Sequence, residues 1–342
     1  GYSAANEKNG NTEKDAYKNL NFNGNIGYRI NKSNKLHFQF YENELNVDLD
    51  NFTPADDTNY KMTGSQYIYN FGYECSYFKD LMIKTNFYKT QTERISTDAD
   101  DIWNNFKYSG NIENINSQID VQKIKNNIIS VGIEHKKEYC KASGDFGWVD
   151  NEKKNAVTKS VYFQDIINFS GIDFLVGIRN DKHDNFGRET TYKTALNYTY
   201  EDFSLSLKSS YGKGFKAPSL YNLYSAYGSA SLQPEISNNF DLAIYKYFKN
   251  GLCSLTYFNN RFKELIDFDY TNWIYYNVNR AKSYGYEFEF NYDFSSFPVM
   301  VDIQYTYMQT ESANGKQLLL RPEHKGEAII NYDINNFKFS PS

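Results

Sequence analysis

Residues 284–292 read YGYEFEFNY, and this segment decides the class of fold. Aromatic side chains occupy every second position from Tyr286 to Tyr292, with glutamate or asparagine between them. Because successive side chains of a β-strand point to opposite faces, the segment has one aromatic and one polar face. Charged side chains stay hydrated on the wall of a water-filled barrel but are costly inside a soluble sandwich. The segment therefore favours a transmembrane barrel, and a large soluble antiparallel sheet with one solvated face is the alternative.

The same alternation recurs along the chain. Residues 21–30, 36–40 and 67–74 place aromatic or aliphatic side chains on one face. Segments 64–78 and 81–96 run to about 15 residues, whereas strands of soluble sheets usually have roughly 5 or 6. A tilted strand needs only about 9 to 11 residues to cross a bilayer. We therefore expect strands that cross a membrane and project beyond it.

Short polar turns alternate with longer polar loops. We expect the turns at residues 31–35, 79–80, 123–126, 170–171, 201–202, 249–251, 295–296 and 335–336. We expect the long loops at residues 5–16, 48–63, 97–103, 140–157, 215–237, 268–280 and 311–323. Transmembrane barrels have short turns on the periplasmic side and long loops outside, so this rhythm predicts an all-β, antiparallel, up-and-down barrel.

The rhythm gives about 15 full strands, with partial strands at residues 1–5 and 337–342. Bacterial barrels are closed and even-numbered, because lipid cannot satisfy an open sheet edge. An odd count with incomplete strands at both ends predicts that residues 1–342 form one partial barrel domain. Further strands are then expected beyond both termini.

Composition agrees with a membrane barrel and excludes other classes. The chain has 32 Tyr and 26 Phe, and Tyr suits a membrane boundary because its ring is apolar and its hydroxyl polar. No run approaches 18 apolar residues, so no transmembrane helix is expected. The net charge of -5 argues against a nucleic-acid-binding protein, which carries a basic face. No P-loop, nucleophile elbow, HExxH or zinc spacing occurs, so the sequence offers no candidate for catalysis.

Several spaced motifs carry a family resemblance. They read GFKAPSLYNLY at 214–224, LQPEIS at 232–237, LTYFNNRFKELIDF at 255–268 and YYNVNRAKSYGYE at 275–287. In this order they resemble the barrel of TonB-dependent outer-membrane receptors. The resemblance implies a barrel of about 22 strands in the outer membrane of a Gram-negative bacterium.

The resemblance also implies a mechanism. In this family an N-terminal plug domain fills the barrel, external loops trap a scarce nutrient, and an inner-membrane TonB complex pulls on the plug to open a path. The plug is expected outside residues 1–342. The ligand contacts expected on this chain are loop aromatics and one arginine, namely Tyr221, Tyr227, Tyr275, Tyr276 and Arg321.

Some motif residues have expected roles in the scaffold. Pro218 lacks a backbone donor and should end the preceding strand. Gly285 should lie where a bulky side chain would crowd a neighbouring strand. Arg280 and Lys282 are expected to pair with acidic groups in the lumen.

The substrate inferred from the resemblance is vitamin B12 (cobalamin). Residues 177–192 (GIRNDKHDNFGRETTY), 264–270 (ELIDFDY) and 274–287 (IYYNVNRAKSYGYE) look like the cobalamin-receptor subfamily. Siderophore receptors share much of this scaffold and stay open as an alternative. Haem receptors place a haem-binding His between two boxes, but residues 215–235 contain no His. A passive, porin-like barrel is the alternative from a different class.

Calcium is the expected cofactor. Cobalamin receptors bind calcium in long extracellular loops between early strands, and calcium takes about six to eight oxygen ligands. The matching carboxylates here are Glu13 and Asp15 in the first loop and Asp48 and Asp57 in the second. A solvated acidic loop without metal is the alternative.

Overall fold

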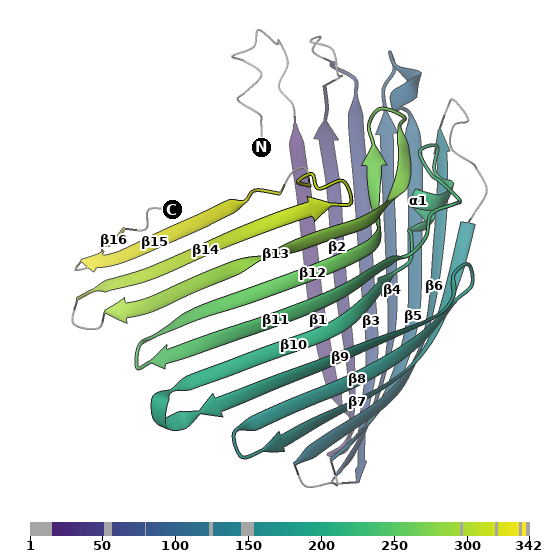
Figure 1. Ribbon diagram of the computed structural model, residues 1–342. Helices are drawn as coiled ribbons and strands as arrows, with labels where there is room; N and C mark the ends of the chain where they lie inside the picture. Colours follow the sequence, from purple (N-terminus) through teal and green to yellow (C-terminus); the bar gives the residue numbers. More distant parts are fainter. Residues whose placement is uncertain are drawn as a thin grey trace.

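The computed structural model describes residues 16–50, 57–78, 80–122, 126–144, 154–294, 297–318, 321–334 and 337–339. These residues form one antiparallel sheet of 16 strands, in which each strand pairs with the next along the chain (Figure 1). The predicted all-β, up-and-down architecture is confirmed. The first eight strands are β1 (Tyr17–Arg29), β2 (Asn34–Asp48), β3 (Lys61–Phe78), β4 (Leu81–Thr97), β5 (Phe106–Val121), β6 (Asn127–Gly144), β7 (Lys154–Phe169) and β8 (Ile172–His183). The others are β9 (Gly187–Tyr200), β10 (Leu205–Lys216), β11 (Glu235–Phe248), β12 (Gly251–Asp269), β13 (Ile274–Phe294), β14 (Val299–Ser312), β15 (His324–Ile334) and β16 (Phe337–Phe339).

Helical structure in these ranges is confined to three short segments. They are α1 (Leu220–Tyr224) and the 3-10 turns η2 (Ile102–Asn104) and η3 (Glu201–Phe203). None of the helices in the described ranges has the length and apolar character needed to cross a membrane.

The connections follow the predicted rhythm, with two differences. β8 and β9 are joined by residues 184–186 alone, so a short connection lies at the end of the sheet that carries the long loops. The loop predicted at 268–280 is a turn of residues 270–273, because residues 265–269 pair in register with residues 274–278. The Asp269 carboxylate stabilises this turn by accepting hydrogen bonds from the N–H groups of Thr271 (2.8 Å) and Asn272 (3.2 Å).

Two rows of aromatic rings mark the outward face of the sheet. Aliphatic side chains such as Leu255, 47% exposed, lie between the rows without protein cover. Aromatic girdles around an exposed apolar band are typical of membrane-spanning barrels. The upper girdle, toward the long loops, comprises Tyr192, Tyr211, Phe240, Tyr257 and Tyr286. The lower girdle comprises Tyr200, Phe203, Phe248, Tyr292 and Phe294.

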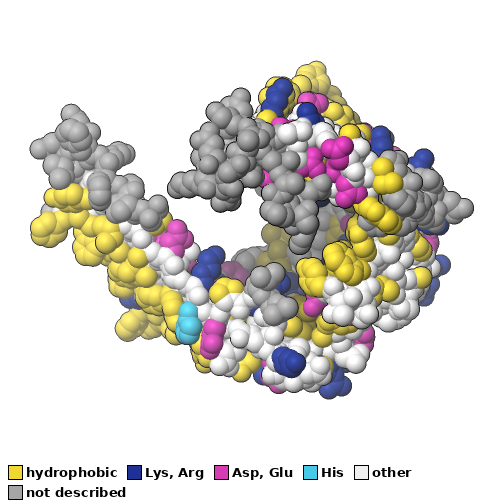
Figure 2. All heavy atoms as spheres, turned by 90° about the horizontal axis from the view of Figure 1, so that it is seen from above, with side chains coloured by type: hydrophobic (Ala, Val, Ile, Leu, Met, Phe, Trp, Pro, Cys, Tyr) yellow, Lys and Arg dark blue, Asp and Glu magenta, His cyan; other side chains and the backbone are white. Residues whose placement is uncertain are grey.

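The inward face is polar. Asp120, for example, accepts a hydrogen bond from the Ser130 hydroxyl (2.7 Å), and its other oxygen lies 2.9 Å from the Lys84 ammonium. Seen from above, the sheet forms an open ring whose one arm carries hydrophobic side chains along its outer side (Figure 2). The register corrects one expectation: Arg280 and Lys282 alternate in step with Tyr286, so they lie on the outward face and not in the lumen.

The sheet curves without closing. Among the described residues β1 pairs only with β2, and β16 pairs only with β15 (Figure 1). The short β16 agrees with the predicted partial strand at 337–342, whereas residues 1–5 lie outside the described residues. Because lipid cannot satisfy the backbone groups of an open edge, this sheet fits part of a larger closed barrel.

Candidate functional site

A sharp turn after β10 creates the helix α1. β10 ends at Lys216, and Pro218 follows where the chain leaves the ladder, as the sequence predicts. The Ser219 hydroxyl oxygen accepts a hydrogen bond from the N–H of Asn222 (3.1 Å), and the Asn222 side-chain oxygen accepts one from the N–H of Ser219 (3.1 Å). This reciprocal cap satisfies two donors at the start of α1 and fixes the helix at the end of the strand.

The apolar side of α1 packs against the lumen wall. Leu220 is buried against Cys140 of β6 and Ala156 of β7, and Tyr108 and Tyr224 cover this group. Cys140 and Ala156 belong to the inward faces of their strands by alternation. α1 therefore lies in the mouth of the barrel, against β6 and β7 (Figure 1).

Asn277 fastens the loop between β10 and β11 to β12 and β13. Its side-chain oxygen accepts a hydrogen bond from the N–H of Gln233 (2.8 Å). Its amide donates to the carbonyls of Gln233 (3.0 Å) and Glu264 (2.7 Å). Glu264 has a φ of 55°, in the left-handed region, and interrupts the ladder between β12 and β13. Asn277 thus satisfies the carbonyl that this irregularity leaves without a ladder partner.

Six aromatic side chains meet at the loop end of the sheet and form what we call the aromatic loop cluster. Tyr221 lies edge-on to Tyr108 and Tyr275, with ring centroids 5.8 and 6.2 Å away. Phe268 lies 5.0 Å from Tyr275 and 5.9 Å from Tyr227. The cluster consists of Tyr108, Tyr221, Tyr227, Phe268, Trp273 and Tyr275.

The environment of the cluster keeps Tyr221 neutral. Burial, and the nearby phenols of Tyr275 and Tyr227, raise the pKa of Tyr221 above its ordinary value of 10.0. At physiological pH its hydroxyl is therefore a neutral hydrogen-bonding group.

The cluster also presents an apolar ring surface to the solvent, because the Trp273 side chain is 56% exposed. Such a surface, with few polar groups, suits the binding of a large ring-shaped or aromatic ligand.

A cavity of about 400 Å³ lies between α1 and the lumen wall. Arg179 organises its polar side, with its guanidinium 3.2 Å from Glu134 and 2.8 Å from Asp181. The same guanidinium donates to the Ser160 hydroxyl oxygen (2.7 Å), and that hydroxyl donates to Asp181 (2.5 Å). Because each charge in this network is paired, the wall is fixed in place, and α1 supplies the apolar side of the cavity.

The structure brings together three of the five predicted ligand contacts. Tyr221, Tyr227 and Tyr275 all belong to the aromatic loop cluster. Tyr276 is the strand neighbour of Tyr275, so it points to the opposite face of β13, where it is 43% exposed. Arg321 lies in the connection between β14 and β15, where its carbonyl accepts a hydrogen bond from the Gln317 amide (3.2 Å).

The predicted calcium ligands are placed only in part. Glu13 and Asp15 lie outside the described residues. Asp48 accepts a hydrogen bond from the N–H of Ala16 (3.1 Å), and the buried Asp57 accepts hydrogen bonds from two N–H groups of its own loop (3.1 and 3.0 Å). The described ranges contain no group of three or more His, Cys, Asp or Glu side chains that could hold a metal ion. The calcium site stays a prediction that depends on Glu13 and Asp15.

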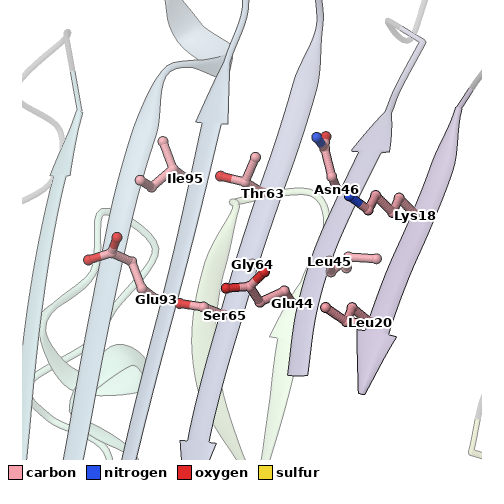
Figure 3. Close-up of a pocket in the computed structure, with 10 residues that line it drawn as sticks. All are labelled: Lys18, Leu20, Glu44, Leu45, Asn46, Thr63, Gly64, Ser65, Glu93 and Ile95. Atoms are coloured by element: carbon pink, nitrogen blue, oxygen red, sulfur yellow. The ribbon is translucent and has the colours of Figure 1, made fainter. Parts of the chain in front are cut away.

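A second hollow, of about 290 Å³, crosses strands β1 to β4 (Figure 3). Among the side chains that line it, Leu20, Glu44, Ser65 and Glu93 are register partners on successive strands. They alternate in step with the exposed Phe22, so this hollow opens on the outward face. It is therefore separate from the site in the barrel mouth.

The fold and the loop architecture agree with one known family. A family model described as "TonB dependent receptor-like, beta-barrel" matches residues 1–340. The chain belongs to this family. Its members are outer-membrane proteins of Gram-negative bacteria, so the predicted location is confirmed.

Curated relatives carry the name "Vitamin B12 transporter BtuB". The protein from Vibrio cholerae is 31% identical over 159 residues, which is 46% of this chain and 26% of that protein. The protein from Photobacterium profundum is 24% identical over 331 residues, which is 94% of this chain and 52% of that protein. The chain thus spans about half the length of this second relative.

Solved structures of similar fold include siderophore receptors. PirA from Acinetobacter baumannii has a TM-score of 0.77 at 17% identity, and the match covers 97% of this chain and 59% of that one. The ferric enterobactin receptor PfeA from Pseudomonas aeruginosa has a TM-score of 0.77 at 16% identity, covering 94% and 56%. At these identities the likeness shows the fold alone.

Several residues of the site were not predicted from the sequence. Phe268 and Trp273 complete the aromatic loop cluster, and Arg179 organises the cavity wall. The segment GIRNDKH could have indicated the role of Arg179. In this segment Arg179 and Asp181 alternate with the outward Ile178, so both charged side chains point into the lumen. No local pattern distinguishes Phe268 or Trp273 from the many other aromatic residues, because their role depends on a turn between two long strands.

Proposed function

We propose that the chain is the barrel of a TonB-dependent receptor that takes up cobalamin across the outer membrane. The observation that supports this most is the aromatic loop cluster, which gathers three predicted contacts over the mouth of the barrel. The family and the BtuB relatives support the same transport class. Uptake would also require a plug domain and the TonB complex, as the family resemblance implies.

In this proposal each part of the site has a separate task. The aromatic loop cluster contacts the apolar edges of the corrin ring, and α1 with its capped start holds Tyr221 in position. The paired charges around Arg179 form a rigid polar wall below. Asn277 keeps the loop between β10 and β11 docked on β12 and β13, so the aromatic surface is preformed before the ligand arrives.

A siderophore is the second candidate ligand. An aromatic ring surface of this kind would also accept the aromatic groups of a ferric siderophore. A strongly anionic ferric siderophore would favour nearby positive charge, and Arg94 lines the same cavity as Tyr108 and Tyr221 of the cluster. The BtuB relatives therefore carry the preference for cobalamin over a siderophore.

Equilibrium titration of the full-length protein tests the proposal. Cyanocobalamin should bind with submicromolar affinity, and ferric enterobactin, haem and an unrelated sugar should bind at least tenfold more weakly. The titration is repeated with calcium and with a calcium chelator. An Asp48→Ala plus Asp57→Ala variant should lose any calcium dependence, and unchanged affinity at limiting calcium would defeat the metal prediction but not the transport class. Steady ion conductance without any tight ligand would instead support a porin-like barrel.

A further inference from the structure

Four basic residues crowd two neighbouring strands near the loop end of the sheet. β12 contributes Arg261 and Lys263, and β13 contributes Arg280 and Lys282. The register places Arg261 directly opposite Lys282, and Lys263 directly opposite Arg280. We call these four residues the basic quartet.

The basic quartet faces outward, toward lipid. Arg261 and Lys282 alternate in step with Tyr257 and Tyr286 of the upper girdle. The Lys282 ammonium lies 4.0 Å from the centre of the Tyr284 ring, and the other three members are exposed. The quartet therefore begins just beyond the upper girdle, on the side of the long loops.

The cations of the basic quartet form no ion pairs within the described part of the chain. Glu311 of β14 is the register partner of Lys282, but no ion pair forms between any quartet member and a described carboxylate. The next outward carboxylate of β12 is Asp267, four residues beyond Lys263, or about 13 Å along the strand. Like charges directly opposite each other destabilise an antiparallel pair. The basic quartet should therefore attract an anion that is not part of the protein.

Two lysines elsewhere on the outward face have carboxylate partners. Lys89 lies 3.3 Å from Glu113, and Lys107 lies 2.7 Å from Glu93. Each of these pairs joins β4 to β5 on the same face of the sheet. The sheet can therefore balance outward lysines with carboxylates, and it does not do so on β12 and β13.

The position of the basic quartet, just beyond the upper girdle, indicates which anion it binds. Aromatic girdles lie where the hydrocarbon of a bilayer meets its headgroups. Long basic side chains just beyond a girdle reach headgroup phosphates, and arginine can bind a phosphate with two parallel hydrogen bonds. We propose that the basic quartet binds the phosphate groups of anionic lipids in the outer leaflet. This proposal rests on the membrane-spanning fold and is independent of which nutrient the receptor takes up.

Lipid binding by the full-length receptor in zwitterionic detergent tests the proposal. Native mass spectrometry gives dissociation constants for phosphatidylglycerol and phosphatidylcholine. The wild type should prefer phosphatidylglycerol. Each removed cation should weaken that binding about fivefold, so an Arg261→Gln plus Lys282→Gln variant should lose about 25-fold while its weak binding of phosphatidylcholine stays the same.

Three controls make the result specific. A Lys89→Gln plus Lys107→Gln variant changes the net charge equally and should keep the wild-type affinity for phosphatidylglycerol. An Arg261→Lys plus Arg280→Lys variant keeps the charge and should retain most of the binding. The heat-induced mobility shift on gels reports whether each variant is folded. All variants should show this shift, because removing charges that repel each other does not disrupt the barrel. Equal affinity for both lipids, equal loss in the Lys89 and Lys107 control, or displacement of the lipid by an equal concentration of inorganic phosphate would overturn the proposal.

Discussion

Gly285 is the residue at which β13 and β14 approach too closely for a side chain. A Cβ placed there would clash with the carbonyl oxygen of Tyr307 and lie 3.0 Å from the Cα of Met308. Both obstacles are backbone atoms, so neither can rotate away. This agrees with the role expected for Gly285 from its sequence motif.

We therefore expect Gly285→Ala to destabilise the folded barrel by about 1 to 3 kcal/mol, the usual cost of overpacking. The urea midpoint of refolded protein in detergent measures the change. Gly177→Ala is the matched control, because Gly177 is also paired on both sides and the nearest atom to a Cβ there, the Phe163 carbonyl oxygen, is 3.7 Å away. Equal midpoints for the two variants would show that β13 and β14 can separate at no cost.

Tyr221 is the residue on which the aromatic loop cluster depends most. Tyr221→Ala removes its ring contacts with Tyr108 and Tyr275, each worth about 0.5 to 1.5 kcal/mol. We expect cobalamin affinity to fall about tenfold, whereas Tyr221→Phe should keep most of it. If both variants bind like the wild type, the cluster is not the binding surface.

The same residue predicts a pH dependence. Since the folded state raises the pKa of Tyr221, the stabilisation from its neutral phenol is fully present below pH 10.0 and is lost as pH rises through the raised value. A spectroscopic titration of phenolate absorbance should therefore show one fewer late-ionising tyrosine in Tyr221→Phe than in the wild type. A titration of Tyr221 at or below pH 10.0 would contradict the buried position.

At the scale of elements, Asn277 joins a loop to two strands. Asn277→Ala removes three hydrogen bonds, each worth about 1 kcal/mol. We expect the amide of Gln233 to exchange with solvent at least fivefold faster, as followed by hydrogen–deuterium exchange. Asn279→Ala, an exposed change two residues along β13, serves as the control. Unchanged exchange in the Asn277 variant would mean that the loop is held by other contacts.

Elements of this sheet differ in how far the sequence predicts them. Strands such as β13 follow from alternation alone, because one face meets lipid and the other water. The turn at 270–273 was predicted as a long loop, since strands above the membrane have polar residues on both faces and lose the alternating pattern. The side-chain contacts of Asn277 and Arg179 depend on segments that are distant in sequence, so no local sequence pattern predicts these contacts.

Across the sheet as a whole, the two faces have separate roles. The girdles, the exposed aliphatic band and the basic quartet all lie outward, while the Arg179 network and α1 lie inward. The ligand-binding and lipid-binding proposals use opposite faces, so each can fail without the other. Both require that the outward face touches a bilayer.

Site-directed spin labelling of β13 in lipid vesicles tests that requirement most directly. Single labels at positions 286 to 292, in a full-length protein whose Cys75, Cys140 and Cys253 are replaced by serine, report collisions with oxygen and with a water-soluble nickel complex. Labels at 286, 288, 290 and 292 should favour oxygen, and labels at 287, 289 and 291 should favour the nickel complex. Uniform accessibility along the strand, or the opposite alternation, would contradict a membrane barrel.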